Sequence, residues 1–294
     1  MDLSPFAEEV GVDGPVTITG LGTRGGPVDG VRTVYAPSGI DWVQPAEMTV
    51  GCGAGTPVAE LDEALVVHGQ AVAIPPSGTV GGALAAGRSG LRRLGYGPVR
   101  DALLQARYVS AAGDVVKAGG PTVKNVSGFD LCRLLVGSSG TLGFIGDVIL
   151  RTRPRARHEQ WFQGRFDPLE ALARLYRPSS VLWDGTTTWV LLEGDRRDVA
   201  TESALLDAEP AAGPPPLPVG GRWSIDPARM GDLRGDFVVE VGVGVVHHVD
   251  PAPPTPVDPG VRALTRRIKE RFDPRGRLNP GVDVLEGSVG APRR

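Results

Sequence analysis

Clustered glycines that interrupt short apolar runs are the feature that most restricts the fold of this chain. Glycine and proline number 42 and 27 among 294 residues, and they lack the strict period of collagen. The β-branched run Val16–Thr19 is a predicted strand that stops at the glycine segment Gly20–Gly26. Thr49 and Val50 end another predicted strand, which runs into a second glycine segment. Glycine lets a main chain turn tightly and approach a ligand closely, so this alternation predicts an α+β unit rich in special turns.

The segment Gly20–Gly25 has the spacing G-x-G-x-x-G that follows the first strand of a Rossmann fold. A Rossmann site needs a long helix directly after this motif, but Gly26, Pro27 and Gly30 would break one. The sequence therefore argues against a Rossmann fold. Two interpretations stay open: an ordinary tight turn, or a turn whose backbone N–H groups bind a phosphate.

A second set of small residues lies at the predicted start of a helix, from Gly78 to Gly90. Small residues there allow an anion to reach unpaired N–H groups and the positive end of the helix dipole. Nearby arginines are either phosphate ligands or solvated surface groups. Lys124 and Asn125 precede an apolar helix that Ser127 or Asp130 would cap, and they either face a flavin or substrate or belong to an ordinary loop.

The pattern of elements divides the chain into four parts. Residues 1–153 form the glycine-rich α+β domain, in which Thr56 is expected to cap a helix that continues to about Gly69. Residues 154–258 lose the glycine turns and form a smaller domain, with one strand predicted across Val239–His247. Residues 259–285 form a helix and a segment that packs back on the first domain, and residues 286–294 are expected to be a disordered tail.

Composition excludes several classes of protein. The formal net charge of −3 and pI near 5.9 favour neither nucleic acid nor anionic lipid as a partner. Two cysteines, Cys52 and Cys132, cannot supply a four-thiolate metal or iron–sulfur site, and no metal is expected. The chain lacks a signal peptide and a membrane-spanning apolar run, so we expect a cytoplasmic protein.

Taken together, the glycine segments resemble the FAD-binding domain of the vanillyl-alcohol oxidase and p-cresol methylhydroxylase (PCMH) superfamily. They are most similar to those of the smaller FAD-binding component of bacterial glycolate oxidases. The resemblance is carried by Gly20–Gly26, Thr49–Leu61, Gly78–Gly90, Tyr96–Asp101, Val123–Leu135, Gly137–Gly143 and Phe272–Gly281.

The resemblance implies a PCMH-type domain of two α+β subdomains with a smaller α+β cap or substrate domain, and it implies FAD as the cofactor. It also implies that the first two glycine turns surround the pyrophosphate, that Ile145 lies near the adenine and that Asn125 points toward the flavin. The family's β-α-β segment before the first turn is nearly absent, because only residues 1–14 precede Pro15. No histidine stands out for a covalent flavin link, so noncovalent FAD is expected. The residues expected to bind the cofactor are Gly20, Gly22, Thr23, Gly78, Thr79, Gly81, Gly82, Gly90, Asn125 and Ile145.

Oxidation of a small 2-hydroxy acid by a flavin requires a base for the hydroxyl proton. His247, at the end of a strand in the second domain, is the only candidate catalytic base, and packing is the alternative interpretation of the same position. The resemblance implies a complex with a second FAD-containing subunit and an iron–sulfur subunit, with attachment to the inner membrane through these partners left open. A scaffold subunit that has lost FAD and a stand-alone FAD-linked oxidase are the other hypotheses.

Overall fold

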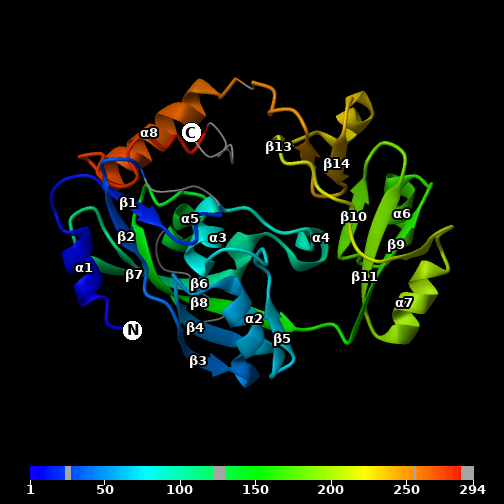
Figure 1. Ribbon diagram of the computed structural model, residues 1–294, viewed down its shortest axis with the longest axis horizontal. Helices are drawn as coiled ribbons and strands as arrows, with labels where there is room; N and C mark the ends of the chain where they lie inside the picture. The colour runs from blue at the N-terminus through cyan, green and yellow to red at the C-terminus, as the bar shows by residue number, and fades with distance from the viewer. Residues whose placement is uncertain (24–27, 122–129, 255, 286–294) are drawn as a thin grey trace. The chain divides into compact units, whose positions relative to one another are not determined.

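The structure is a computed structural model that describes residues 1–23, 28–121, 130–254 and 256–285 (Figure 1). The chain separates into two compact units, and both combine helices with β-sheets, as the sequence predicts for an α+β protein. Unit 1 comprises residues 1–90, 98–154 and 256–294, and unit 2 comprises residues 91–97 and 155–255. Asn125 and the expected tail 286–294 fall outside the described residues.

Unit 1 is built on a six-stranded sheet in which β3, β4, β8, β6 and β7 are neighbours in that order and β5 pairs with β8. A separate parallel pair, β1 and β2, completes its strands. The strands are β1 (Val16–Thr19), β2 (Arg32–Tyr35), β3 (Ile40–Gln44), β4 (Thr49–Gly53), β5 (Gln70–Val72), β6 (Leu103–Val109), β7 (Val115–Gly119) and β8 (Phe144–Pro154). Its helices are α1 (Ser4–Val10), η1 (Pro45–Glu47), α2 (Val58–Val66), α3 (Val80–Ala86), η2 (Val99–Ala102), α5 (Leu131–Leu135) and α8 (Pro259–Phe272).

The core of unit 1 follows from the apolar spacing of its helices. Val58, Leu61 and Leu65 lie on one face of α2 and are buried with Leu84 of α3 and Leu135 of α5. A fully buried Leu side chain contributes roughly 2 kcal/mol of hydrophobic free energy, so this cluster holds the helices on the sheet.

The predicted cap of α2 is wrong. Pro57 is the N-cap residue and makes no side-chain capping bond, whereas the Thr56 hydroxyl donates to the Gly39 carbonyl at 3.1 Å and accepts from the Gly39 N–H at 3.0 Å. Thr56 is buried, and the loop before β3 offers it backbone partners that a local sequence pattern does not reveal. Asp130 does cap α5, because its carboxylate accepts the Arg133 N–H at 3.2 Å.

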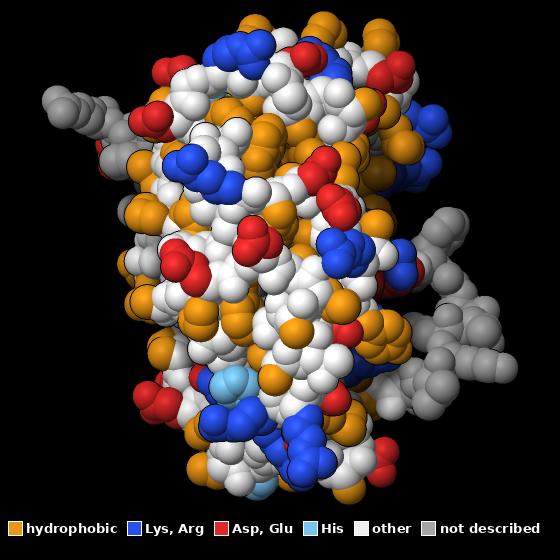
Figure 2. Space-filling view, turned by 90° about the vertical axis from the view of Figure 1, so that its right-hand side faces the viewer, with side chains coloured by type: hydrophobic (Ala, Val, Ile, Leu, Met, Phe, Trp, Pro, Cys, Tyr) orange, Lys and Arg blue, Asp and Glu red, His pale blue; other side chains and the backbone are white. Residues whose placement is uncertain are grey.

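Unit 2 is an antiparallel sheet of seven strands in the order β12, β9, β11, β10, β14, β15 and β13. The strands are β9 (His158–Gly164), β10 (Ser180–Trp183), β11 (Thr188–Gly194), β12 (Glu209–Ala211), β13 (Gly221–Ser224), β14 (Phe237–Glu240) and β15 (Val245–His248). The helices are α4 (Arg93–Tyr96), α6 (Pro168–Arg174), α7 (Arg196–Ser203) and η3 (Pro227–Asp232). On the face drawn in Figure 2, acidic, basic and apolar side chains alternate, and neither sign of charge covers that face.

The single strand predicted across Val239–His247 is wrong, because the segment forms a hairpin of β14 and β15. Gly242 and Gly244 have φ values of +78° and +72°, which most side chains avoid, and they reverse the chain. Val239 then pairs with Val246, and Glu240 pairs with Val245. The hairpin brings Glu240 and His247 onto one face of the sheet.

Candidate functional site

The first glycine turn lies directly against the second. Gly20 follows β1, and a Cβ atom added to Gly20 would lie 2.6 Å from Thr79 Oγ1 and 3.0 Å from Thr79 Cγ2. Contacts this short are not tolerated, so only glycine permits the approach. Thr79 itself is buried and caps α3, with its hydroxyl accepting the Gly82 N–H at 3.1 Å.

The N–H groups at the start of α3 are already used within the protein, contrary to the expectation that they are unpaired. The Val80 N–H donates to the Thr56 carbonyl at 2.9 Å, and the Gly81 N–H donates to the Ala54 carbonyl at 2.7 Å. A Cβ atom on Gly81 would lie 2.8 Å from the Ala54 Cβ, so α3 starts in close contact with the end of β4. An anion at this site would therefore be approached by the backbone of the exposed turns before α3, from Gly20 and from Pro76.

The residues expected to bind the cofactor differ in exposure. Gly20, Gly22 and Thr23 are exposed, whereas Thr79 and Ile145 are buried. Gly78 and Gly82 are half-buried, as is Gly90, and Gly81 lies at the closely packed start of α3. The structure therefore brings the first and second turns together, while Ile145 lies in the core of unit 1 on β8.

Asn279 braces the end of β1, and the sequence prediction missed it as a site residue. Its side chain accepts the Ile18 N–H at 2.6 Å and donates to the Ser139 carbonyl at 2.6 Å. Its backbone N–H donates to the Val16 carbonyl at 2.9 Å, beside the contact between Val16 and Leu278. Asn279 thus holds the end of β1 against the glycine turn at 137–143, and its place in the segment Phe272–Gly281, which carries part of the family resemblance, was the available signal.

Asp273 fixes the segment that carries Asn279. Its side chain is fully buried, and its carboxylate lies 2.6 Å from Lys269 Nζ and accepts the N–H groups of Arg277 at 3.0 Å and Leu278 at 2.7 Å. Burial by itself would raise the pKa of Asp273, but the hydrogen bonds from Lys269 and from the two backbone N–H groups outweigh it and lower that pKa below the usual range of an aspartate. The ionised carboxylate therefore orders the chain between α8 and Asn279.

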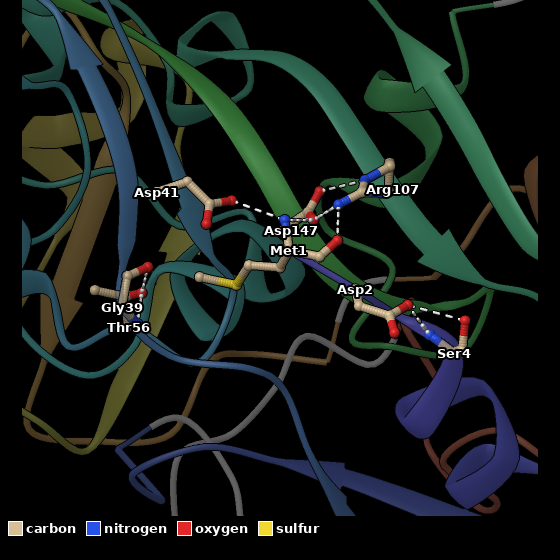
Figure 3. Close-up of polar contacts among 8 residues, drawn as sticks. All are labelled: Met1, Asp2, Ser4, Gly39, Asp41, Thr56, Arg107 and Asp147. Atoms are coloured by element: carbon tan, nitrogen blue, oxygen red, sulfur yellow. Dashed lines mark hydrogen bonds and ion pairs between the residues drawn. The ribbon is translucent and has the colours of Figure 1, made fainter.

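A charged cluster ties the residues before α1 to the sheet of unit 1 (Figure 3). Arg107 of β6 and Asp147 of β8 form an ion pair, with Arg107 Nε donating to Asp147 Oδ1 at 3.0 Å. The Met1 amino group lies 3.0 Å from Asp41 Oδ2 and 3.6 Å from Asp147 Oδ2, and Arg107 also donates to the Met1 carbonyl. Asp147 is two residues from Ile145 on β8, so this cluster stiffens the strand expected near the adenine.

Both cysteines are buried in the core of unit 1. Burial raises the pKa of Cys52 to about 12 and the pKa of Cys132 to about 11. Thiolate is the nucleophile and the metal-binding form of cysteine, so neither residue is activated for chemistry at neutral pH.

In unit 2, His247 lies beside a buried acid. His247 Nε2 is 2.8 Å from Glu240 Oε1, and Arg222 Nη2 is 3.5 Å from the same oxygen. The side chain of Glu240 is 2% exposed, whereas those of His247 and Arg222 are 13% and 23% exposed. Glu240 and Arg222 were not recognised from the sequence, because only the strand register brings them to His247.

Two features are lacking in the described part of the chain. Its helices are too short or too polar to cross a membrane. No three His, Cys, Asp or Glu side chains of residues 1–23, 28–121, 130–254 and 256–285 converge as a ligand set for a metal ion.

Comparison with known proteins places this site in context. A family model described as FAD binding domain matches residues 15–119. The chain is 31% identical to the glycolate oxidase subunit GlcE of Escherichia coli (strain K12) over 258 residues, which cover 78% of this chain and 74% of the relative. The matched residues, 15–119, include the first two glycine turns, so these turns lie within the FAD-binding domain.

Other relatives match a smaller share of the chain. D-lactate dehydrogenase of Archaeoglobus fulgidus is 41% identical over 111 residues, covering 36% of this chain and 25% of the relative. Glycolate oxidase subunit GlcD of Bacillus subtilis is 33% identical over 123 residues, covering 40% of this chain and 26% of the relative. The match thus spans about a quarter of the length of these two proteins.

The solved structure of an alkyldihydroxyacetonephosphate synthase shares the fold. It superposes with a TM-score of 0.67 over 95% of this chain and 73% of that protein, at 15% sequence identity. This likeness supports the PCMH-type α+β architecture expected from the glycine segments.

Proposed function

The chain belongs to the family of FAD-binding oxidoreductase proteins that includes the glycolate oxidase subunit GlcE, and we propose that it is the noncovalent FAD-carrying subunit of a 2-hydroxy-acid oxidase complex. FAD is the cofactor of this family. The substrate class, the complex and the passage of electrons through it are the parts that we propose.

The observation that carries the proposal is the contact between the two glycine turns. Gly20 approaches Thr79 so closely that a methyl group would lie 2.6 Å from the Thr79 hydroxyl oxygen. The turns therefore present exposed backbone with few side chains, and such a surface fits the diphosphate of a dinucleotide.

Within this proposal, the exposed backbone of Gly20 to Thr23 and of Pro76 and Ser77, with the half-buried Gly78, would hold the FAD diphosphate. Thr79 would keep the second turn in place by capping α3, and Asn279 would hold the end of β1, where the first turn begins, against Ser139. Ile145, in the core on β8, would contribute to the wall near the adenine, and Asn125 would reach toward the flavin. When bound, FAD would supply the two-electron redox chemistry, while the protein supplies binding and orientation.

Support for a multi-subunit complex comes from the names of two relatives, GlcE and GlcD, which are subunits of glycolate oxidases. We expect a partner with a second FAD and an iron–sulfur partner to receive the electrons. Within this proposal the chain is cytoplasmic and reaches the inner membrane only through these partners.

The test begins with the purified protein and a visible absorption spectrum. A yellow protein that releases FAD into the supernatant after acid precipitation supports noncovalent binding. Anaerobic addition of glycolate should bleach the flavin slowly or not at all in the isolated chain, and rapidly after the two partner subunits are added.

Two other results would replace the proposal. A protein that folds but binds no flavin would be a scaffold subunit. Rapid bleaching by glycolate or lactate in the absence of partners would identify a stand-alone oxidase.

A further inference from the structure

Residues 277–279, which follow α8 in unit 1, lie along one side of β1 (Figure 1). The Val16 N–H donates to the Arg277 carbonyl at 2.9 Å, and the Asn279 N–H donates to the Val16 carbonyl at 2.9 Å. β2 pairs in parallel with the other side of β1. The first glycine turn, which begins at Gly20, therefore leaves the middle one of three parallel segments, and one of these comes from the far end of the chain.

The buried side chain of Arg277 binds backbone carbonyl groups. A guanidinium group has five N–H donors, and this residue is only 4% exposed. All five donors are used, at distances of 2.6 to 3.2 Å, and their acceptors are the carbonyl oxygens of Val10, Gly11, Asp13, Gly14 and Ala111. One side chain thus joins the end of α1, the loop that follows it and the turn between β6 and β7.

The loop before β1 has the shape that this guanidinium group requires. Gly11 and Gly14 have φ values of +58° and +69°, which glycine adopts far more easily than other residues. Their two turns direct four carbonyl groups of residues 10–14 toward the same side chain. The carbonyls of Val10 and Gly11 also lie at the C-terminal end of α1, where the helix dipole favours a positive charge.

The segment that carries Arg277 is attached at few points. The helix before it, α8, has no buried residue. The buried residues of the segment are Asp273, Arg277, Leu278 and Asn279. Segments with few buried contacts open locally while the rest of the domain stays folded. Residues 273–279, which we call the C-terminal clasp, are therefore suited to open and close as one unit.

We propose that Arg277 is a positioning residue for FAD: it docks the C-terminal clasp on residues 10–14, and the docked clasp holds β1 so that the first glycine turn binds the diphosphate. Within the clasp, Asn279 fixes the Ile18 N–H, two residues before Gly20, at 2.6 Å. Coupling between two equilibria is reciprocal, so bound FAD stabilises the docked clasp by the same factor by which docking strengthens FAD binding. The coupling to FAD rests on the proposed function, whereas the docking by Arg277 does not.

Hydrogen exchange of the flavin-free protein tests the docking. Peptides that cover residues 14–19 and 273–280 should exchange together and faster than β8 in the core. Arg277→Lys should speed exchange in both peptides about tenfold or more and leave β8 unchanged, because an ammonium group has three donors and lacks the planar fork. Unchanged exchange in both peptides, or equal acceleration in β8, overturns the docking role.

Cofactor binding tests the coupling. With FAD at about a hundred times its dissociation constant, exchange in residues 273–280 of the native protein should slow about tenfold or more, because the open clasp binds FAD poorly. Arg277→Met leaves the five carbonyls without their common donor, so the docked form becomes the minor one and the dissociation constant of FAD should rise about tenfold or more. Exchange that FAD does not slow, or equal FAD binding by Arg277→Met and the native protein, overturns the coupling.

Matched variants separate these results from misfolding. Arg275→Gln removes an exposed arginine that pairs with the Asp13 side chain at 3.0 Å, and it should exchange and bind FAD as the native protein does. If the Arg277 variants do not fold, Gly14→Ala tests the same contact, because its Cβ meets open space and its positive φ strains the carbonyl that Arg277 Nε binds. Gly14→Ala should speed exchange in both peptides, and no change there overturns the docking role. Gly69→Ala, with similar space and a φ of +62°, should leave both peptides as in the native protein.

The two sets of measurements also separate failure of this inference from failure of the proposed function. A native protein that binds no FAD, but whose two peptides respond together to Arg277→Lys, refutes the proposed function and keeps the docking role. A native protein that binds FAD as tightly as Arg277→Met does keeps the proposed function and refutes the coupling.

Discussion

At the scale of single residues, Thr79 has two roles that meet at one hydroxyl group. Its Oγ1 accepts the Gly82 N–H at 3.1 Å, and the backbone of Gly20 lies against the same side chain. The residue therefore caps α3 and also sets the distance between the two glycine turns. A buried side chain with both roles couples helix stability to cofactor binding.

Replacing Thr79 with valine keeps the shape of the side chain and removes the hydroxyl. The loss of a helix cap should lower the free energy of unfolding by about 1 kcal/mol. We expect FAD to dissociate more readily from this variant, because the turn before α3 loses its anchor. Urea unfolding and flavin fluorescence measure the two effects.

Thr79→Ser is the matched control, since serine keeps the capping oxygen. It should retain most of the stability and of the FAD affinity that Thr79→Val loses. If Thr79→Ser weakens FAD binding as much as Thr79→Val does, keeping the capping oxygen does not preserve binding and this explanation is wrong.

The thiols allow a second prediction at the residue scale. Burial raises the pKa of Cys52 to about 12 and that of Cys132 to about 11, so both are protonated at neutral pH. The folded protein should therefore not react with a thiol reagent such as Ellman's reagent, and both cysteines should react after denaturation. Rapid reaction of either cysteine in the folded protein would contradict the described packing.

At the scale of elements, the connection from α8 to Asn279 depends on one ionised carboxylate. The pKa of Asp273 in the folded protein lies below the usual range of an aspartate, despite its burial, because Lys269 and two backbone N–H groups bind its charged form. A group whose folded pKa is depressed contributes stability above its unfolded pKa, and this stability is lost as the pH falls through the folded pKa.

Asp273→Asn should therefore lower the free energy of unfolding by roughly 2 kcal/mol at neutral pH, as expected for hydrogen bonds to a charged group. The difference from the native protein should shrink below about pH 4, where the unfolded aspartate becomes protonated. Urea unfolding at pH values on either side of this window measures the effect. Glu270→Gln, an exposed residue on the same helix, is the control and should show little change at either pH.

Sequence patterns predicted some elements well and failed at others for a physical reason. The helix at 131–135 and the strand Val16–Thr19 were predicted correctly, because their apolar spacing and flanking turns are local. The segment Val239–His247 was predicted to be one strand from its alternating valines. Its two glycines, Gly242 and Gly244, have positive φ values that reverse the chain. The role of Thr56 was also missed, because its partner Gly39 is 17 residues away in the sequence.

At the scale of the whole molecule, the glycine turns could be recognised from the sequence, but what holds them together could not. Asn279 reaches Ile18 across a sequence separation of 261 residues, and no local pattern reveals that contact. The cluster of Glu240, His247 and Arg222 likewise appears only when three strands are set in register. Turns can thus be predicted from their residue types in the sequence. The partners of buried polar side chains are known only once the fold is known.

The most direct test of the central claim is a fluorescence titration of the flavin-free protein with FAD. The native chain should bind one FAD at micromolar concentration or below. Gly20→Val should raise the dissociation constant about tenfold or more, which corresponds to about 1.4 kcal/mol, because the new side chain forces Gly20 away from Thr79. Gly213→Val, at a position with open space around its Cβ, should bind like the native protein. A folded native chain that does not bind FAD, or equal FAD binding by Gly20→Val, would contradict the account.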